Sequence, residues 1–299
     1  MRDLIAAEMM KVRTRWLPYG LLILMVLGAG VQIWLFGYTA WWDLRDETDP
    51  EITNDLPLAI RTFTLPWAFP ALVDSGQFWG AMIIGVFIAS AVATEYNWGT
   101  MRQAIARGQS RGLWLASKLL GLALFCAILL LIVLAWGVVS ILWTTSLAGF
   151  DITLDPPGSA EMTLIDGVLI VLRGAMGILP YALLAFALAV IGRSTAIGAA
   201  GIVLFMIIEA SLIPLFGSLP EPWQALRSVT IGYNVSALMA ANRIDEGEYA
   251  SIAPRTALDP SDAPDPWLAF AMLCAWSAAL VGVTYHVFRR RDLRLGTGE

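Results

Sequence analysis

Six long apolar runs alternate with polar segments along the chain, and this alternation dominates its hydropathy pattern. Each run has about 17 residues or more, the length that an α-helix needs to cross the hydrocarbon core of a bilayer. The pattern therefore predicts an all-α polytopic membrane protein, with one transmembrane domain over residues 1–299. The six predicted spans are residues 16–37, 78–94, 113–143, 166–192, 197–217 and 267–288.

Two connectors, residues 38–77 and 218–266, are long enough to form structure of their own. The first is rich in acidic side chains, but its stretch around Trp67 is too apolar to lie free in water. This first connector could therefore be either a solvated loop or a small folded subdomain. The second connector has a semi-apolar centre, residues 223–241, which is too polar to span a membrane alone. We expect the two connectors to pack together over the outer mouth of a transport pathway.

The first fifteen residues predict a helix that lies in the headgroup layer before the first span. On a helix, Ile5, Met9, Val12 and Trp16 would form one narrow apolar stripe, and Lys11 would lie off this stripe. This pattern is typical of an interfacial helix.

Composition supports the membrane assignment and excludes several kinds of chemistry. Of the 299 residues, 58% are hydrophobic and only 14% are charged, whereas a soluble domain carries about a quarter charged residues. Cys126 and Cys274 lie inside apolar runs, so we expect no disulfide framework, and one histidine, His286, leaves little for a metal site or an intramembrane enzyme. No phosphate-binding loop or hydrolase motif occurs. We therefore expect no catalytic residues, cofactor, metal or nucleic-acid partner on this chain.

The basic residues indicate which side of the membrane each segment faces. Of the 19 lysines and arginines, thirteen lie in the N-terminal segment, the segment after the second span, the turn at Arg193 and the C-terminal tail. The connectors on the opposite side carry five. Because cytoplasmic loops carry the excess of basic residues, both termini are predicted to be cytoplasmic.

The segment between the second and third spans, residues 95–118, has the most distinctive local pattern. It carries four basic residues against one acid, Glu95. Thr100 and Gln103 have the spacing of a capping box, which predicts that a short helix begins at Thr100. Gly99 permits the turn just before it.

The same segment has signals for an apolar face and for the end of the helix. Met101, Ala104 and Ile105 recur at helical spacing. Gly108 is suited to a left-handed terminus, and Ser110 can cap the following helix. A plain connector whose arginines only set topology would not need a helix with an apolar face of its own, although this alternative stays open.

This segment also resembles a known family. The pattern Glu95-Tyr96-x-x-Gly99-Thr100-x-Arg102, followed by Gly108-x-Ser110-Arg111 and Lys118, resembles the loop after the second membrane helix of ABC-2-type permeases. These permeases are the membrane subunits of one class of ABC exporters. The resemblance extends to the six-span layout and to the tail from Arg290 to Leu293.

The resemblance implies a machine with several subunits in a prokaryotic cytoplasmic (inner) membrane. Two copies of a separate ATPase subunit would bind ATP and Mg²⁺, and a second permease copy would complete a homodimer. The chain would be the permease subunit that moves an amphipathic substrate, such as a drug, a peptide or a lipid-like molecule, out of the cytoplasm. The resemblance also implies an interfacial N-terminal helix and a re-entrant segment at residues 223–241, between spans five and six.

In this family the segment after the second span forms a coupling helix that docks in a groove of the ATPase. Carried over, Met101, Ala104 and Ile105 would enter that groove. Arg102 or Arg107 would meet acidic groups at its rim, and Glu95 would orient the basic residues of the loop. The residues assigned to coupling are thus Glu95, Gly99, Thr100, Met101, Arg102, Ala104, Ile105 and Arg107.

Two ionisable residues lie within the predicted spans, Arg173 in the fourth and Glu209 in the fifth. A tight turn joins these spans, so the residues should sit at similar depth, and we expect an intramembrane ion pair between them. Alternatively, Glu209 faces the pathway and meets a cationic cargo. A different class of function, an ion-coupled carrier or channel using Arg173 and Glu209, also stays open.

Overall fold

The structure, a computed structural model, describes residues 2–46, 56–154, 162–220, 222–242 and 265–290, and all regular secondary structure in them is helical. Six helical segments in this part of the chain are long and apolar enough to cross a membrane. The prediction of an all-α polytopic membrane protein is therefore confirmed. The six segments are α2 (Leu17–Gly30) continued by η1 (Val31–Thr39) and α3 (Ala40–Leu44), then α6 (Ala68–Asn97), α8 (Arg111–Leu147), α9 (Leu164–Gly192), α10 (Thr195–Gly217) and α12 (Pro266–Arg290).

Five shorter elements connect or precede the long helices. They include α7, which lies between α6 and α8, and α11, which follows the 3-10 helix η2. The helix α6 begins at Ala68 instead of residue 78, because Pro70 is tolerated in a first turn. The shorter elements are α1 (Arg2–Arg13), α5 (Leu56–Phe63), α7 (Thr100–Ala106), η2 (Trp223–Val229) and α11 (Ile231–Ala240).

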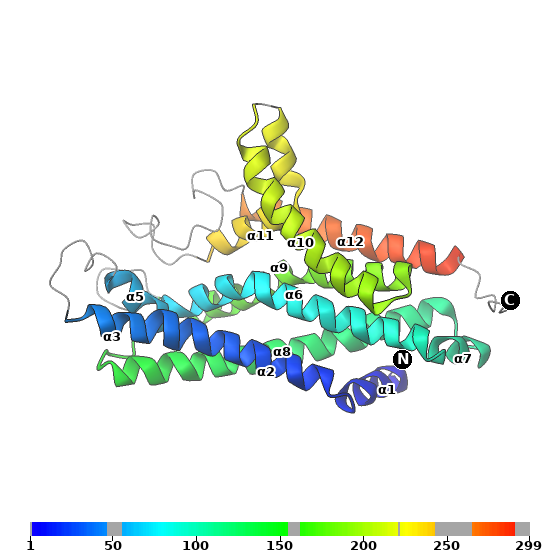
Figure 1. Ribbon diagram of the computed structural model, residues 1–299, viewed down its shortest axis with the longest axis horizontal. Helices are drawn as coiled ribbons and strands as arrows, with labels where there is room; N and C mark the ends of the chain where they lie inside the picture. The colour runs from blue at the N-terminus through cyan, green and yellow to red at the C-terminus, as the bar shows by residue number, and fades with distance from the viewer. Residues whose placement is uncertain (1, 47–55, 155–161, 221, 243–264, 291–299) are drawn as a thin grey trace.

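The long helices form an elongated bundle with α6 and α9 at its centre. In Figure 1, α1, α7 and the end of α12 lie at one end of the bundle, and α3 and α5 lie at the other. In their most apolar stretches, 56% of α6 and 61% of α9 is buried, against 17–28% in the other four segments. The second and fourth segments thus form the core, and the others expose apolar faces suited to lipid.

The first connector is held against the outer part of the bundle by a separate apolar cluster. Ile33 of η1, Phe63 of α5 and Ile141 of α8 are fully buried there, and Thr145 donates a hydrogen bond to the carbonyl oxygen of Phe63 at 3.0 Å. The short helix α11 packs instead on α9, α10 and α12. The described helices of the two connectors therefore pack in different places, and the prediction that they cover one another is wrong for these helices.

The N-terminal helix α1 buries only part of the predicted apolar stripe. It ends at Arg13, and Trp16, which was to complete the apolar stripe, is 80% exposed. Val12 is buried against the main core, and Glu8, one turn earlier, is buried beside it. The side chain of Ile5 lies outside the described residues. Tertiary packing on α8 thus selects a face that combines an apolar and an acidic residue.

The second connector contains the helix α11, which is buried although it is too short to cross a membrane. Its 10 residues span about 15 Å. Ile231 and Asn234 in this helix are almost completely buried. The end of α10 and the adjoining η2 project from the bundle in Figure 1, while α11 returns to it.

Candidate functional site

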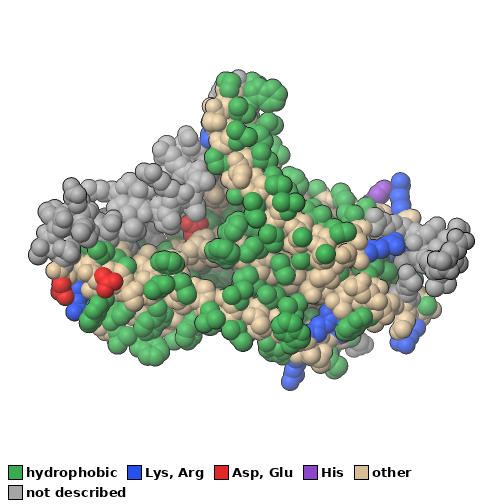
Figure 2. Space-filling model, viewed as in Figure 1, with side chains coloured by type: hydrophobic (Ala, Val, Ile, Leu, Met, Phe, Trp, Pro, Cys, Tyr) green, Lys and Arg blue, Asp and Glu red, His purple; other side chains and the backbone are tan. Residues whose placement is uncertain are grey.

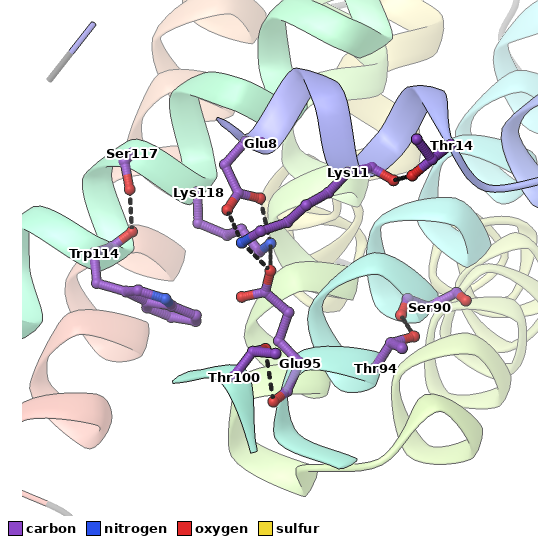
Figure 3. Close-up of polar contacts among 10 residues, drawn as sticks. All are labelled: Glu8, Lys11, Thr14, Ser90, Thr94, Glu95, Thr100, Trp114, Ser117 and Lys118. Carbon is purple, nitrogen blue, oxygen red and sulfur yellow. Dashed lines mark hydrogen bonds and ion pairs between the residues drawn. The ribbon is translucent and has the colours of Figure 1, made fainter. Parts of the chain in front are cut away.

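Four charged side chains meet where α1, α6 and α8 converge, and Figure 3 shows them as an alternating set of acids and bases. We call this set, Glu8, Lys11, Glu95 and Lys118, the ionic cluster. The Nζ atom of Lys118 lies 2.6 Å from Oε1 of Glu95 and also contacts Oε2 of Glu8. The Nζ atom of Lys11 lies 2.7 Å from Oε1 of Glu8 and 2.9 Å from Oε1 of Glu95. The two carboxylates and two ammonium groups cancel in charge.

Three members of the ionic cluster are withdrawn from solvent. The exposed fractions are 1% for Glu95, 3% for Lys118 and 6% for Glu8. Such side chains are almost never fully buried unless they are paired. Lys118 turns inward, where Glu8 and Glu95 supply its partners. The second carboxylate oxygen of Glu95, Oε2, has no hydrogen-bond partner among the described residues.

The surroundings of Glu8 and Lys11, the two cluster members on α1, shift their pKa values in the directions that favour the charged forms. Burial by itself would raise the pKa of Glu8, but the ammonium of Lys118 and hydrogen bonds from both lysines outweigh it, so this pKa lies below its usual value. Burial would likewise lower the pKa of Lys11, but hydrogen bonds to Glu8 and Glu95 outweigh it and leave this pKa raised. Both cluster members on α1 are therefore favoured in their charged forms.

Close approach of α1 to α8 depends on Gly121. A Cβ atom at this position would lie 2.8 Å from Cβ of Glu8, closer than real side chains come. Our sequence reasoning missed Glu8. Its signal is present, since Glu8 lies three residues before Lys11 and four before Val12, and thus shares a helical face with both.

The helix α7 begins only a few residues after Glu95 and is bounded by two glycines with left-handed backbones. The φ angles are 69° at Gly99 and 88° at Gly108, so both predicted turns are confirmed. Ser110 caps α8 as expected, because its hydroxyl accepts a hydrogen bond from the backbone N–H of Leu113 at 3.2 Å. These turns fold α7 back between two long helices.

The predicted capping box at Thr100 is wrong. Gly99 occupies the N-cap position, and no side chain caps α7. The left-handed turn places Thr100 already inside the helix, where its hydroxyl donates to the carbonyl oxygen of Glu95 at 3.4 Å. Gln103 extends away as an exposed side chain.

The apolar face of α7 points inward. Met101 is 3% exposed and belongs to the main core, and Ala104 and Ile105 pack against that core. Met101 is therefore covered by the protein's own core, whereas Ala104 and Ile105 are half-buried, and insertion of these residues into a partner's groove stays a prediction. The side chain of Arg102 lies outside the described residues. The outward residues of α7, at helical spacing, are Gln103, Ala106 and Arg107.

Arginines surround α7 at this end of the bundle, where Figure 2 shows several basic side chains. Arg111 donates a hydrogen bond to the backbone oxygen of Arg289 at 2.9 Å. The rings of Trp114 and Phe288 stack at 5.2 Å, which joins the start of α8 to the end of α12. Of the predicted tail motif, only Arg290 is among the described residues. We call this surface, with Arg107, Arg111, Arg289 and Arg290, the basic end.

The ion pair expected between Arg173 and Glu209 is not formed. Nη1 of Arg173 donates to the carbonyl oxygen of Ala241 at 2.9 Å and to the side chain of Asn242 at 3.0 Å. Glu209 accepts from the hydroxyl of Tyr181 at 2.6 Å. The helix α11 packs against α9 and α10, which carry Arg173 and Glu209. Each of these side chains bonds to groups at or near one end of α11 and not to the other side chain.

At the basic end, α7 lies between α6 and α8, and Arg111 connects the start of α8 to the end of α12. No group of three or more metal-ligating side chains occurs in the described part of the chain. In a comparison with protein families, the sequence model described as "Protein of unknown function (DUF2705)" matches residues 72–243. This stretch runs from the first turns of α6 to just past α11. It includes Glu95, α7, and both Arg173 and Glu209. No curated protein matches the chain.

Proposed function

We propose that this chain, which belongs to the DUF2705 family of proteins of unknown function, is the permease subunit of an ATP-driven ABC exporter. In this proposal it moves an amphipathic substrate, such as a drug, a peptide or a lipid-like molecule, out of the cytoplasm. Two copies of a separate ATPase subunit bind ATP and Mg²⁺, and a second copy of the chain completes the assembly. The basic end faces the cytoplasm of a prokaryote.

The observation that carries the proposal is the geometry of α7. A short helix is folded between two long helices by two left-handed glycines, Gly99 and Gly108, and its inner face is fixed by Met101. Such a helix can move only with the helices that it joins. It therefore suits the transfer of a partner's motion into the membrane part.

The ionic cluster supports the same role. Glu95 lies in the last turn of α6, the central helix, and is tied to α1 through Lys11 and to α8 through Lys118. Displacement of α7 would therefore reach three helices at once, because a buried ion pair resists separation. In the same proposal, α11 is a segment that re-enters the membrane without crossing it, and α1 lies at the membrane surface.

The docking face of α7 is the exposed one in this proposal. Ala106 offers a small apolar contact and Arg107 a positive charge, so an acidic groove on the ATPase would complement them. Gln103 lies beside them and can form hydrogen bonds at the rim. Arg111 and Arg289 would add to the attraction from the neighbouring helices.

Charge reversal at Arg107 tests this proposal. The chain is expressed with the ATPase encoded by the neighbouring reading frame, and the amount of ATPase that co-purifies is measured. Arg107→Glu is expected to reduce it about tenfold, a loss of about 1.4 kcal/mol, because a carboxylate would face an acidic groove. Arg290→Glu makes the same charge change at the same end on α12 and serves as the control, with a smaller loss expected.

Two results would contradict the proposal. One is that no ATPase co-purifies with the unaltered chain, and the other is an equal effect of both reversals. Transport driven by a sodium or proton gradient without ATP would instead support an ion-coupled carrier.

A further inference from the structure

The two ends of α11 are held by opposite charges from two different membrane helices. At the amino end, Oε1 of Glu209 accepts the backbone N–H of Ile231, the first residue of α11, at 2.6 Å. At the carboxyl end, Nη1 of Arg173 donates to the carbonyl oxygen of Ala241 at 2.9 Å and to Asn242 at 3.0 Å. The anion thus lies where the helix has free N–H groups, and the cation where it has free carbonyl groups.

This arrangement matches the dipole of α11 at both ends. A helix carries a partial positive charge at its amino end and a partial negative charge at its carboxyl end, so Glu209 and Arg173 each meet the opposite sign. Glu209 is only 5% exposed, and such an interaction is stronger in a dry site than at a surface. The helix backbone therefore compensates two charges that do not compensate each other.

Gly232 allows the amino end of α11 to approach Glu209 and Tyr181 closely. A Cβ atom at Gly232 would lie 2.9 Å from Cδ1 of Ile213, 3.2 Å from the hydroxyl of Tyr181 and 3.3 Å from Oε2 of Glu209. Only a residue without a side chain fits here without displacing its neighbours. Tyr181 donates to the same Oε2 atom at 2.6 Å and so orients the carboxyl group.

The entry into α11 is also ordered by side chains. The hydroxyl of Thr230 accepts the backbone N–H of Tyr233 at 3.4 Å. The amide of Asn234 donates to the carbonyl oxygens of Ser228 and Thr230 at 2.8 and 2.7 Å. These bonds join η2 to α11, and Nε1 of Trp276 in α12 donates to the carbonyl oxygen of Val229, the last residue of η2, at 2.8 Å.

We propose that Glu209 and Arg173 form an electrostatic clamp that sets the position of α11, and that α11 moves when either end is released. The proposal does not depend on the exporter role, because it concerns only the placement of α11. Release of one end would leave part of the helix dipole uncompensated and loosen α11 relative to α9 and α10.

Cysteine reactivity in the full chain, reconstituted into lipid vesicles, can detect such loosening. Cys126 and Cys274 are first replaced by alanine. A reporter cysteine is then placed on α11 at Ala237, which is 1% exposed, and in a separate protein on α9 at Ala185, which is 0% exposed. The rate of modification by N-ethylmaleimide is measured for each.

The clamp variants are Glu209→Ala and Arg173→Ala, with Ser211→Ala as the matched control. Ser211 lies on the same helix as Glu209 but bonds only to its own backbone, at Ile207. Each clamp variant is expected to raise the rate at the α11 reporter about tenfold and to leave the α9 reporter unreactive, as local opening requires. No change at α11 would overturn the proposal, and so would an equal rise at both reporters, which would mean general loosening.

Exchange of the two charges gives a second, independent test. If the residues acted on each other, Arg173→Glu combined with Glu209→Arg would keep the attraction and protect the reporter. Because the dipole of α11 keeps its direction, the clamp predicts instead that the exchanged protein reacts at least as fast as either alanine variant. Protection of the α11 reporter in the exchanged protein would overturn the clamp.

Discussion

Buried and half-buried charges in this membrane protein are compensated in two different ways. In the ionic cluster, Glu95 and Lys118 meet side chain to side chain at 2.6 Å. Near α11, Arg173 and Glu209 instead meet backbone groups at helix ends. Both solutions avoid an uncompensated charge in a dry environment, which would be costly. They differ in effect, because the first ties long helices together and the second positions a short one.

Loss of one cluster member should leave the others buried without compensation. Glu95→Ala is expected to destabilise the protein by about 3–5 kcal/mol, because Lys118 then stays buried with a single acid. Glu95→Leu combined with Lys118→Met should recover part of this loss, since both charges are gone. Thermal unfolding in detergent measures both. As a control, Asp46→Ala breaks an exposed pair with Arg45 and should cost less than about 1 kcal/mol; an equal loss in this control would contradict the assigned role of Glu95.

At the scale of the element, α7 shows how packing decides which face of a helix remains available. Its apolar residues recur at helical spacing, but the protein's own core covers them, beginning with Met101. The two glycine turns orient the helix, since they determine how it leaves α6 and enters α8. What remains for a partner is the opposite face with Ala106 and Arg107.

Substitutions on the two faces of α7 should therefore act on different properties. Met101→Ala is expected to lower stability by about 2–5 kcal/mol, as for other buried methionines. Gln103→Ala, on the exposed face of the same helix, should change stability by less than about 0.5 kcal/mol. Chemical denaturation in detergent micelles compares them. Equal stability of the two variants would mean that the inner face of α7 is not buried as described.

At the scale of the whole molecule, the bundle has two chemically different ends. The basic end gathers α1, α7 and the end of α12, whereas α3 and α5 lie at the far end (Figure 1). Arginines predominate at the first and an aromatic group around Trp41 at the second. From the positive-inside rule, we expect α7 to lie on the cytoplasmic side.

Labelling from each side of the membrane tests this orientation. In a background without Cys126 and Cys274, Ala106→Cys should react with an impermeant maleimide only in inverted vesicles. Asp43→Cys, exposed at the far end, should react only in right-side-out vesicles. Reaction of both cysteines from the same side would contradict the six-span arrangement.

Much of the architecture was predictable because it depends on local chemistry. Long apolar runs form spanning helices wherever they occur, since backbone groups in lipid must bond within the segment. Glycines at Gly99 and Gly108 predict left-handed turns, and Ser110 predicts a cap, because these preferences involve only neighbouring residues. The six spans, both turns and the start of α8 follow from such signals.

The tertiary structure alone decided which faces and charges meet. Helical periodicity shows that Met101, Ala104 and Ile105 share a face, but not whether a partner or the protein's own core covers it. Sequence spacing likewise predicted similar depths for Arg173 and Glu209. It could not show that each would bond to one end of α11 and not to the other. A buried charge binds whatever opposite charge or dipole packing brings within hydrogen-bond distance, and that distance is set only when helices far apart in the chain come together.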